Sequence, residues 1–557
     1  MYLGAPVLFI GLFLSFANGR SLSVKLPDAT YSGYHNSTSG LDVWLGVRYA
    51  APPVGELRWR AAQSISEGNG VINSTTMPVQ CIQSQAAWNA TNMSEDCLYL
   101  NVYSPPNAKK LPVLVWAYQF DPTPLINLSG NKFVAVILQY RLGAFGFLSG
   151  SESIAQSNGL NVAITDARFA LQFVQSNIDK FGGSKDDVTI WGQSSGGGTV
   201  LELLVQEGRL QKSTGSKYQA LFKAAIMSSP WFPPLGKCSN TYFKEQFRNF
   251  TLGAGCTPNS TDASALSCLR TAPSSTLRQL NYQMNKAQKG HVNYWTACLE
   301  DDSSKDGYLK IHPIQALKSG IVAGVSRHFL VAVTKKKIKV SQDYVLAGSN
   351  SADGSAPSNL STPTLFESFL TTNWPLTAEQ VTKVASLYPE SAFSDSHARG
   401  VSVYQDAVFA CGSTWATTAF TKRKGSWRYL FGILRRSLFK LSLGGLFMVT
   451  TRTVVAAVHA QDNAYEFPIW YNFRSPVSPS VFSAFGGSIT NFTVGRNPNS
   501  KALNNTWLQA GSGSQIVFNM TSPANVSETY DAEFYAPLSG TKERCDFWAD
   551  ARLSGGW

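Results

Sequence analysis

The sequence predicts an α/β fold built on a large, mostly parallel central sheet that is flanked by helices. Two continuous apolar runs, Leu111–Trp116 and residues 134–140, have the length and composition of strands covered on both faces. Residues 166–181 carry apolar side chains at helical spacing and end before two glycines, and a further strand at 188–191 follows. Strands that alternate with helices are typical of parallel sheets, whose functional sites lie at the carboxyl ends of the strands.

The amino-terminal part of the chain adds extended elements to this core. Residues 41–59 read as an extended segment that is broken at Pro52 and Pro53. Within residues 94–105, apolar side chains alternate at Leu98, Leu100 and Val102, as they do in a half-buried strand.

Composition limits the classes of function. The chain has 557 residues, of which 44% are hydrophobic and 15% are charged, so it can bury a large core. Its formal net charge is +12, but most of the excess comes from Lys and Arg residues in two short segments, 324–342 and 432–453. Because the positive charge is local, we expect no nucleic-acid partner.

The first 19 residues indicate a secreted, extracellular protein. Their apolar run is too short to span a membrane, and small residues at Ala17 and Gly19 are spaced for cleavage before Arg20. Twelve N-x-S/T sequons, the first at Asn36 and the last at Asn525, fit a glycosylated surface. We therefore expect a signal peptide at 1–19, a single domain at 20–557, and no stable membrane insertion.

Eight cysteines fit the same oxidising compartment. Cys81 with Cys97, and Cys256 with Cys268, would close short loops and could form disulfides. The pairing of the other four stays open: Cys238, Cys298, Cys411 and Cys545. The sequence has no C-x-x-C or H-x-x-x-H spacing and no nucleotide or flavin motif, so we expect neither a metal nor a cofactor.

The strand at 188–191 leads into a G-x-S-x-G sequence at residues 192–196. In this pattern the serine lies on a sharp turn between strand and helix, and the flanking glycines avoid clashes that a Cβ would cause. Ser194 would expose its hydroxyl at the carboxyl edge of the sheet, beside a helix amino terminus that favours negative charge. Such motifs also occur in ordinary glycine-rich loops, but the preceding strand and following glycines favour a nucleophile.

Several segments together resemble one known family. The sequences LGVRYAAPPVGELRW, SEDCLYLNVYSP, ILQYRLGAFGFLS, FGGSKDDVTIWGQSSGGG and FKAAIMSSP are similar to those of type-B carboxylesterases and lipases, the cholinesterase-like α/β-hydrolases. The similarity extends over about residues 30–547 and is greatest to fungal secreted members. It implies one α/β-hydrolase domain with long loop excursions, ester hydrolysis through an acyl-enzyme, and a serine–acid–histidine triad. It also supports the Cys81–Cys97 and Cys256–Cys268 disulfides.

The resemblance indicates partners for Ser194. Asp353 stands before a glycine where the family usually has a glutamate, although an aspartate–glycine pair could equally start a turn. His459 matches the family's histidine, whereas His397 lies in a polar segment typical of a solvated helix start. We expect Asp353 as the acid, His459 as the base, and Asp462 as a structural carboxylate.

One departure from the family concerns the oxyanion hole. Family members carry a histidine- and glycine-rich loop after the strand that corresponds to Leu111–Trp116, and its amides form most of that hole. Here the chain passes from Trp116 to Asp121 without a glycine, and about ten residues are missing relative to the family. Only the Ser195 amide is then expected to stabilise the oxyanion, and losing one donor typically costs about 10²–10³ in rate.

The two basic segments, 324–342 and 432–453, resemble nothing in the family. As structure, one could be an exposed hairpin and the other an amphipathic helix that touches a membrane. We favour the hypothesis that both are retained introns and that the short loop after Trp116 reflects a missing exon segment. Transcripts that read continuously through all three regions would exclude this hypothesis.

Two classes of function follow. The favoured class is a secreted serine carboxylic ester hydrolase acting on a small-molecule or lipid ester, as a monomer or homodimer. By family position, Trp231 and Phe232 line its acyl pocket, although they could equally be core residues. The alternative class is a catalytically impaired, esterase-like binding or adhesion protein, because the glycine-rich loop is missing.

Overall fold

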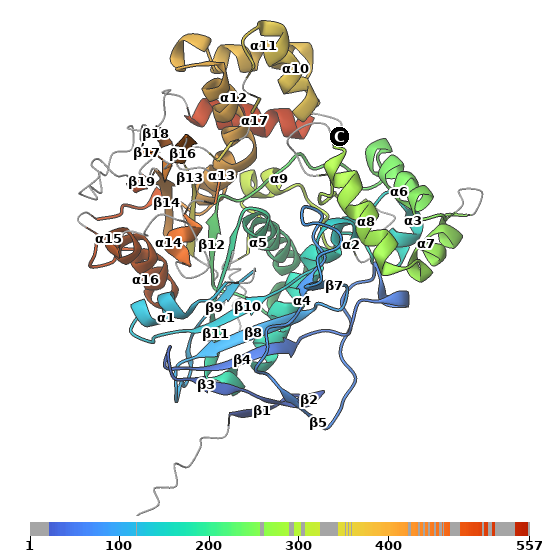
Figure 1. Ribbon diagram of the computed structural model, residues 1–557, viewed down its shortest axis with the longest axis vertical. Helices are drawn as coiled ribbons and strands as arrows, with labels where there is room; N and C mark the ends of the chain where they lie inside the picture. Colours follow the sequence, from blue (N-terminus) through green and yellow to red (C-terminus); the bar gives the residue numbers. More distant parts are fainter. Residues whose placement is uncertain are drawn as a thin grey trace, which may run out of the picture.

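A large twisted sheet with helices on both faces forms the centre of the molecule in the computed structural model (Figure 1). The structure describes residues 22–554 except 118–119, 257–260, 289–293, 302–306, 324–343, 351–352, 355, 358, 422–424, 433–434, 438–439, 444–445, 450–452, 456–458, 461, 468–478, 504–505, 511–514 and 519–540. The expected signal peptide at 1–19 and the basic segment at 324–342 therefore lie outside the described residues.

The main sheet has the strand order β19-β14-β13-β12-β11-β9-β10-β8-β4-β3. From β19 to β10 all neighbours are parallel, and β8, β4 and β3 continue the sheet as antiparallel strands. The strands are β3 (Tyr34–Asn36), β4 (Leu41–Arg48), β8 (Tyr99–Ser104), β9 (Leu111–Trp116), β10 (Val134–Leu138), β11 (Gly183–Gln193), β12 (Ala224–Ser228), β13 (Tyr344–Asn350), β14 (Gly425–Phe431) and β19 (Ile516–Phe518). The predicted α/β fold with a mostly parallel sheet is confirmed.

Alternate residues of the parallel strands supply two separate cores. Val113, Val115 and Ile190 pack on one face with helices α4 (Val162–Asn177) and α5 (Ser195–Thr214). Leu114 and Trp116 point to the opposite face, where the helices are α1 (Thr123–Leu128), α14 (Asn463–Glu466), α15 (Pro479–Val481) and α16 (Gly487–Gly495). Because both faces are covered, the strands read as continuous apolar runs in the sequence.

Two helical regions pack beside the sheet (Figure 1). One contains α2 (Gly143–Phe147), α3 (Glu152–Gln156), α6 (Thr241–Gly253), α7 (Asp262–Thr271) and α8 (Ser274–Lys286). The other contains α10 (Pro363–Asn373), α11 (Ala378–Leu387), α12 (Ser396–Gln405), α13 (Cys411–Ala419) and α17 (Thr541–Ser554), with α9 (Pro313–Lys318) between α5 and α13.

Four disulfides cross-link the described part of the chain. The two expected pairs, Cys81–Cys97 and Cys256–Cys268, are both present. The cysteines whose pairing the sequence left open form Cys238–Cys298 and Cys411–Cys545, which close loops of 60 and 134 residues. The second of these joins α13 to α17, so it attaches the carboxyl-terminal helix to the body of the fold.

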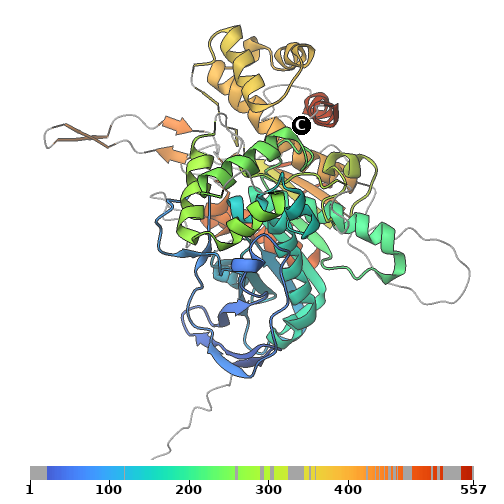
Figure 2. The ribbon, with the colours of Figure 1, turned by 90° about the vertical axis from the view of Figure 1, so that its right-hand side faces the viewer.

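Small sheets complete the architecture. They consist of β1 (Ser23–Lys25), β2 (Ala29–Ser32) and β5 (Gly70–Asn73), and of the pair β6 (Gln80–Cys81) and β7 (Met93–Ser94). In the second basic segment, β15 (Arg435–Ser437) pairs with β18 (Thr453–Val455), and β16 (Lys440–Leu443) with β17 (Leu446–Val449). The strands β15 and β18 extend away from the body (Figure 2). Of the two structures considered for the basic segments, the amphipathic helix does not apply here, since the described backbone is paired as antiparallel strands.

Several predicted boundaries differ from the structure. The helix expected at 166–181 begins earlier, at Val162, and its last turn, Ile178–Phe181, is a 3₁₀-helix. The strand before Ser194 is longer than expected because β11 already begins at Gly183, with an irregularity in its pairing before Val188. No helix among the described residues is long and apolar enough to cross a membrane.

A buried ion pair joins β10 to α4. Arg141, just after β10, donates two hydrogen bonds to Asp166 at 2.6 and 2.7 Å, and the two side chains are 4% and 0% exposed. Removing one partner leaves the other charge buried and uncompensated. We expect Asp166→Ala to lower the free energy of unfolding by about 3–5 kcal/mol, measured by urea titration with tryptophan fluorescence.

The matched control for this pair is the exposed pair Lys318–Asp550, whose side chains are 47% and 73% exposed. Because solvent screens such pairs, Asp550→Ala should change the free energy of unfolding by less than about 1 kcal/mol. Equal effects of the two substitutions would contradict the assignment of Arg141–Asp166 as a buried pair that the fold requires.

Candidate active site

Ser194 lies on the turn between β11 and α5 in an unusual backbone conformation. Its φ and ψ are 56° and −123°, a region that non-glycine residues rarely occupy. The turn is held from two sides, because the Ser194 amide donates to the Ser228 carbonyl at 3.0 Å and its carbonyl accepts from the Trp231 amide at 2.8 Å. Ser194 is therefore fixed at the carboxyl edge of the sheet, as the sequence predicted.

The glycines around Ser194 allow this turn to form, but the steric restriction is stronger at some of them than at others. A Cβ on Gly192 would lie 2.3 Å from the Gly196 carbonyl oxygen, which excludes any larger residue. A Cβ on Gly196 would lie 3.3 Å from the Ala117 oxygen, a tight but milder contact. The stronger restriction falls on Gly198, where a Cβ would be 2.2 Å from the Trp231 oxygen. The helix can approach the loop after β12 only because this position has no side chain.

The structure brings His459 and Asp353 to Ser194. The Ser194 hydroxyl lies 2.8 Å from His459 Nε2, and His459 Nδ1 lies 3.0 Å from Asp353 Oδ1. With the Nδ1 proton donated to the carboxylate, Nε2 is free to accept the serine proton. The imidazole also packs against Phe409, with 4.6 Å between ring centroids. His397, the other histidine after Asp353, is exposed at the start of α12 and takes no part in this arrangement.

Asp353 follows β13 and is buried, with 3% of its surface exposed. Its Oδ2 accepts hydrogen bonds from the Ser229 hydroxyl and the Asn350 amide, both at 2.7 Å, and Oδ1 accepts from Asn350 Nδ2 at 3.2 Å. Three donors besides His459 therefore orient the carboxylate and compensate its charge. Sequence reasoning missed Ser229 and Asn350, because short polar residues near strand ends carry no signal of their own.

A second buried acid, Asp462, lies behind the first. Asn350 Nδ2 also donates to Asp462 Oδ1 at 3.0 Å, and the Tyr429 hydroxyl donates to Oδ2 at 3.2 Å. Burial and the charge of Asp353 raise the pKa of Asp462 to about 6. Burial, with the charge of Asp462, raises the pKa of Glu466 well above its usual value. Asp462 lies where a structural carboxylate was expected, and it shares Asn350 with Asp353.

The acids control the proton affinity of His459. Burial lowers its pKa, but the hydrogen bond to Asp353 and the charges of Asp353 and Asp462 outweigh burial and raise it above the usual 6.5. The same interactions stabilise the imidazolium that forms when Ser194 loses its proton. The neutral imidazole in this position is therefore a stronger general base than a free one, and its cation is stabilised when it forms in a reaction.

Ser195 is the first residue of α5, so its amide is one of those that the helix leaves without an intrahelical acceptor. The strand β9 ends at Trp116 beside this turn, and the Ala117 amide that follows donates to the Trp191 carbonyl at 3.3 Å. Residues 118 and 119 lie outside the described part of the chain. Among the described residues, the Ser195 amide remains the predicted oxyanion donor.

A cavity of about 300 Å³ opens beside Ser194. Trp231 and Phe232, which the sequence placed in an acyl pocket, both line it, together with Phe147, Leu235 and Trp295. Most of these side chains are apolar, so the cavity suits a hydrophobic portion of a ligand next to the Ser194 hydroxyl.

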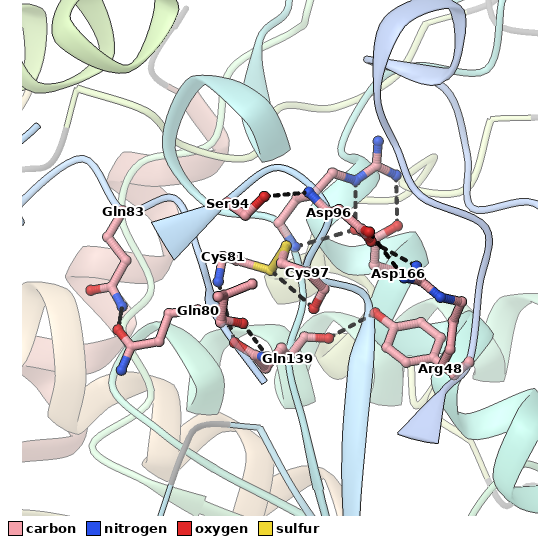
Figure 3. Close-up of a disulfide and its surroundings, with 12 residues drawn as sticks. Arg48, Gln80, Cys81, Gln83, Ser94, Asp96, Cys97, Gln139 and Asp166 are labelled. Carbon is pink, nitrogen blue, oxygen red and sulfur yellow. Dashed lines mark hydrogen bonds and ion pairs between the residues drawn. A yellow bond between two sulfur atoms is a disulfide. The ribbon is translucent and has the colours of Figure 1, made fainter. Parts of the chain in front are cut away.

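The Cys81–Cys97 disulfide holds one wall of the cavity (Figure 3). The Cys81 amide donates to Gln139 Oε1 at 3.2 Å, and Gln139 Nε2 donates to the Val79 carbonyl at 2.9 Å. Gln80, Cys81 and Gln139 all line the cavity. The disulfide thus joins β6 to the residues just before β8, and the hydrogen bonds of Gln139 attach this segment to the end of β10, which fixes the position of that wall.

Comparison with known proteins identifies the family. The family model described as "Carboxylesterase family" matches residues 21–548, nearly the whole chain. The chain belongs to the carboxylesterase family. The predicted resemblance is therefore confirmed, and the central sheet with its flanking helices is the α/β-hydrolase fold of that family.

Relatives of this carboxylesterase-family chain include fungal and animal proteins. It is 31% identical to secreted lipase 1 of Botryotinia fuckeliana over 47% of this chain and 50% of the relative. It is 26% identical to secreted lipase 4 of Gibberella zeae over 83% and 80%, and 36% identical to human cocaine esterase over 39% and 43%. The chain thus spans half or less of two of these relatives and four fifths of the third.

Solved structures share the fold. The crystal structure of Aspergillus niger EstA matches with a TM-score of 0.76 at 23% identity, over 96% of this chain and 99% of that protein. A thermophilic pNB esterase matches with a TM-score of 0.67 at 21% identity, over 89% and 95%. At these identities the likeness concerns the architecture alone.

The pKa of His459 can be measured directly. We expect its imidazole protons to titrate with a midpoint above 6.5 by NMR, because the adjacent carboxylates favour the cation. Asp353→Asn keeps the size of the side chain but removes the charge, so the midpoint should shift downward. As the control, Asp395→Asn alters an exposed carboxylate at the start of α12 and should leave the midpoint unchanged. An unchanged midpoint in Asp353→Asn would contradict the electrostatic role of Asp353.

Proposed function

We propose that this chain is a secreted serine carboxylic ester hydrolase that acts through an acyl-enzyme. The observation that carries the proposal is the hydrogen-bonded series from Ser194 through His459 to Asp353, at distances of 2.8 and 3.0 Å, beside an apolar cavity. Nucleophile, base and orienting acid occur in the chain order that α/β-hydrolases use. Membership of the carboxylesterase family supports the choice of esters as substrates.

The mechanism follows from the hydrogen bonds that join Ser194, His459 and Asp353. Ser194 attacks the ester carbonyl while His459 Nε2 accepts the hydroxyl proton, and Asp353 holds the tautomer and stabilises the imidazolium. His459 then protonates the leaving alcohol, and an acyl group remains on Ser194. Water, activated by His459 in the same way, attacks the acyl-enzyme and releases the acid. No step requires a metal or an organic cofactor.

The oxyanion that develops during the reaction has few hydrogen-bond donors in this site. The Ser195 amide and the positive end of α5 face the charge that forms at the substrate carbonyl. The chain has no glycine between Trp116 and Asp121 to turn further amides toward it. We therefore expect this chain to be slower than carboxylesterases that have a complete oxyanion hole.

The same observation supports a second candidate function. Without further donors, a fold with an assembled triad and an apolar cavity could bind esters or protein partners without turning them over at a useful rate. This alternative is an esterase-like binding or adhesion protein. It differs from the first candidate in one property, which is whether Ser194 becomes acylated.

Secretion is part of the proposal. Four disulfides fit an oxidising compartment, and two similar fungal proteins are secreted lipases. We propose a signal peptide at 1–19 and one domain from residue 20 onward, with a small-molecule or lipid ester as substrate. A monomer or homodimer and the absence of a nucleic-acid partner stay predictions.

Acylation of Ser194 is the direct test. We expect a fluorophosphonate probe to label the intact chain slowly, and to leave Ser194→Ala unlabelled, because only an activated serine hydroxyl reacts with it. His459→Ala should reduce the labelling rate by at least about 10³. His397→Ala is the matched control and should label at the unaltered rate. An unlabelled intact chain that still binds p-nitrophenyl esters would favour the binding protein.

Restoring oxyanion donors tests the other half of the proposal. A glycine-rich insertion of about ten residues between Trp116 and Asp121 should raise kcat for p-nitrophenyl butyrate by about 10²–10³ for each donor gained. A Thr-rich insertion of equal length is the control, because β-branched residues resist the turn that aims amides inward. If the intact chain already labels as fast as a complete carboxylesterase, the argument about missing donors is wrong.

A further inference from the structure

Helix α5 carries a buried acid that the proposed mechanism does not use. Glu202 is 5% exposed and lines the cavity that opens at Ser194. Its Oε2 atom is buried and has no hydrogen-bond partner among the described residues. Asp166 is compensated by Arg141, and Glu207 by Arg168 and Tyr308. Glu466 of α14 also has a buried Oε2 without a partner among the described residues, but of these two acids only Glu202 lines the cavity. Glu202 therefore needs a separate explanation.

The position of Glu202 relates it to the reacting atoms. Ser195, Gly198, Thr199 and Glu202 recur at helical spacing, and all four line the cavity. Glu202 comes seven residues after Ser195, which is about 10 Å along the helix. Glu202 therefore lines the same cavity as Ser194 but at a distance from the scissile bond.

Apolar side chains share the cavity wall with Glu202. Ile164, Phe147 and Leu235 line the same cavity, and no buried cation of the described chain is paired with Glu202. Burial raises the pKa of Glu202 to about 8, against a smaller opposing effect of a hydrogen bond with Gln206. At neutral pH the carboxyl group keeps its proton and can both donate and accept a hydrogen bond.

A leucine would fill such a position without leaving a polar atom unpaired, and an unpaired buried polar atom destabilises the folded protein. We propose that Glu202 is a specificity residue, and that it binds a hydroxyl group on the substrate chain, remote from the scissile carbonyl. The substrate class is thus an ester with a hydroxylated chain. This inference rests on the proposed function, since it concerns the same cavity.

The hydroxyl could belong to either half of the ester, and two pairs of probes separate the sources. p-Nitrophenyl 8-hydroxyoctanoate and octanoate place it on the acyl chain. 8-Hydroxyoctyl acetate and octyl acetate place it on the alcohol. In one of the pairs, we expect kcat/KM to be about tenfold higher for the hydroxylated ester, because the Glu202 carboxyl group gains a hydrogen bond from the substrate only there.

Substitutions at Glu202 test whether this residue causes the preference for the hydroxylated ester. Glu202→Leu should bring the ratio to about one, and Glu202→Gln should retain part of it, because an amide still forms a hydrogen bond. Lys212→Gln changes an exposed residue of the same helix and should keep the full ratio. Glu202→Leu should unfold at a temperature no lower than the unaltered protein, since it removes an unpaired buried polar atom.

A ratio that is unchanged in Glu202→Leu, or no preference in either pair, would overturn the inference. A stronger preference for p-nitrophenyl 8-aminooctanoate would also overturn it, because a cation would then be the ligand.

If no ester is hydrolysed at all, the proposed function is wrong, and a binding measurement then tests the role of Glu202. In Ser194→Ala, quenching of cavity tryptophan fluorescence should report tighter binding of 1,8-octanediol than of octan-1-ol by about tenfold. Adding Glu202→Leu should remove that difference, and its persistence would reject the inference.

Discussion

Ser194 is held at a φ of 56° between β11 and α5, and this strained turn positions the rest of the site. Two backbone hydrogen bonds, to Ser228 and Trp231, keep the turn in place. Glycines at 192 and 198 permit the helix and the loop after β12 to approach it. Because these contacts hold the turn in its strained conformation, the Ser194 hydroxyl lies at a fixed position within hydrogen-bonding distance of His459.

Behind the serine, a network of buried polar groups performs two tasks. Asn350 donates to both Asp353 and Asp462, so it couples the end of β13 to the segment that carries His459. The two acids raise the pKa of His459 although its partial burial would lower it. Compensating hydrogen bonds from Ser229 and Tyr429 make this concentration of acids tolerable in a buried place.

Helix α5 contributes to both the oxyanion site and the cavity. At its first turn the helix presents free amides to developing negative charge, and two turns later Glu202, whose Oε2 has no hydrogen-bond partner among the described residues, lines the cavity. Neither feature stabilises the folded protein, and both make sense as contacts to a bound ester. We propose that the connection after β9, which has no glycine between Trp116 and Asp121, supplies fewer donors at the first of these places, so that turnover and binding specificity can be measured as separate properties.

The sequence by itself determined the α/β class, the nucleophile turn and the identity of Asp353 and His459 as its expected partners. Continuous apolar strands, a G-x-S-x-G turn and family motifs are local signals, because each depends on the backbone and burial of its own segment. The tertiary structure decided the Cys238–Cys298 and Cys411–Cys545 pairs, the bridging role of Asn350, and the exposure of Glu202 to the cavity. Those features join residues from separate strands and helices, and only the packing of the sheet with its helices sets the distances between them.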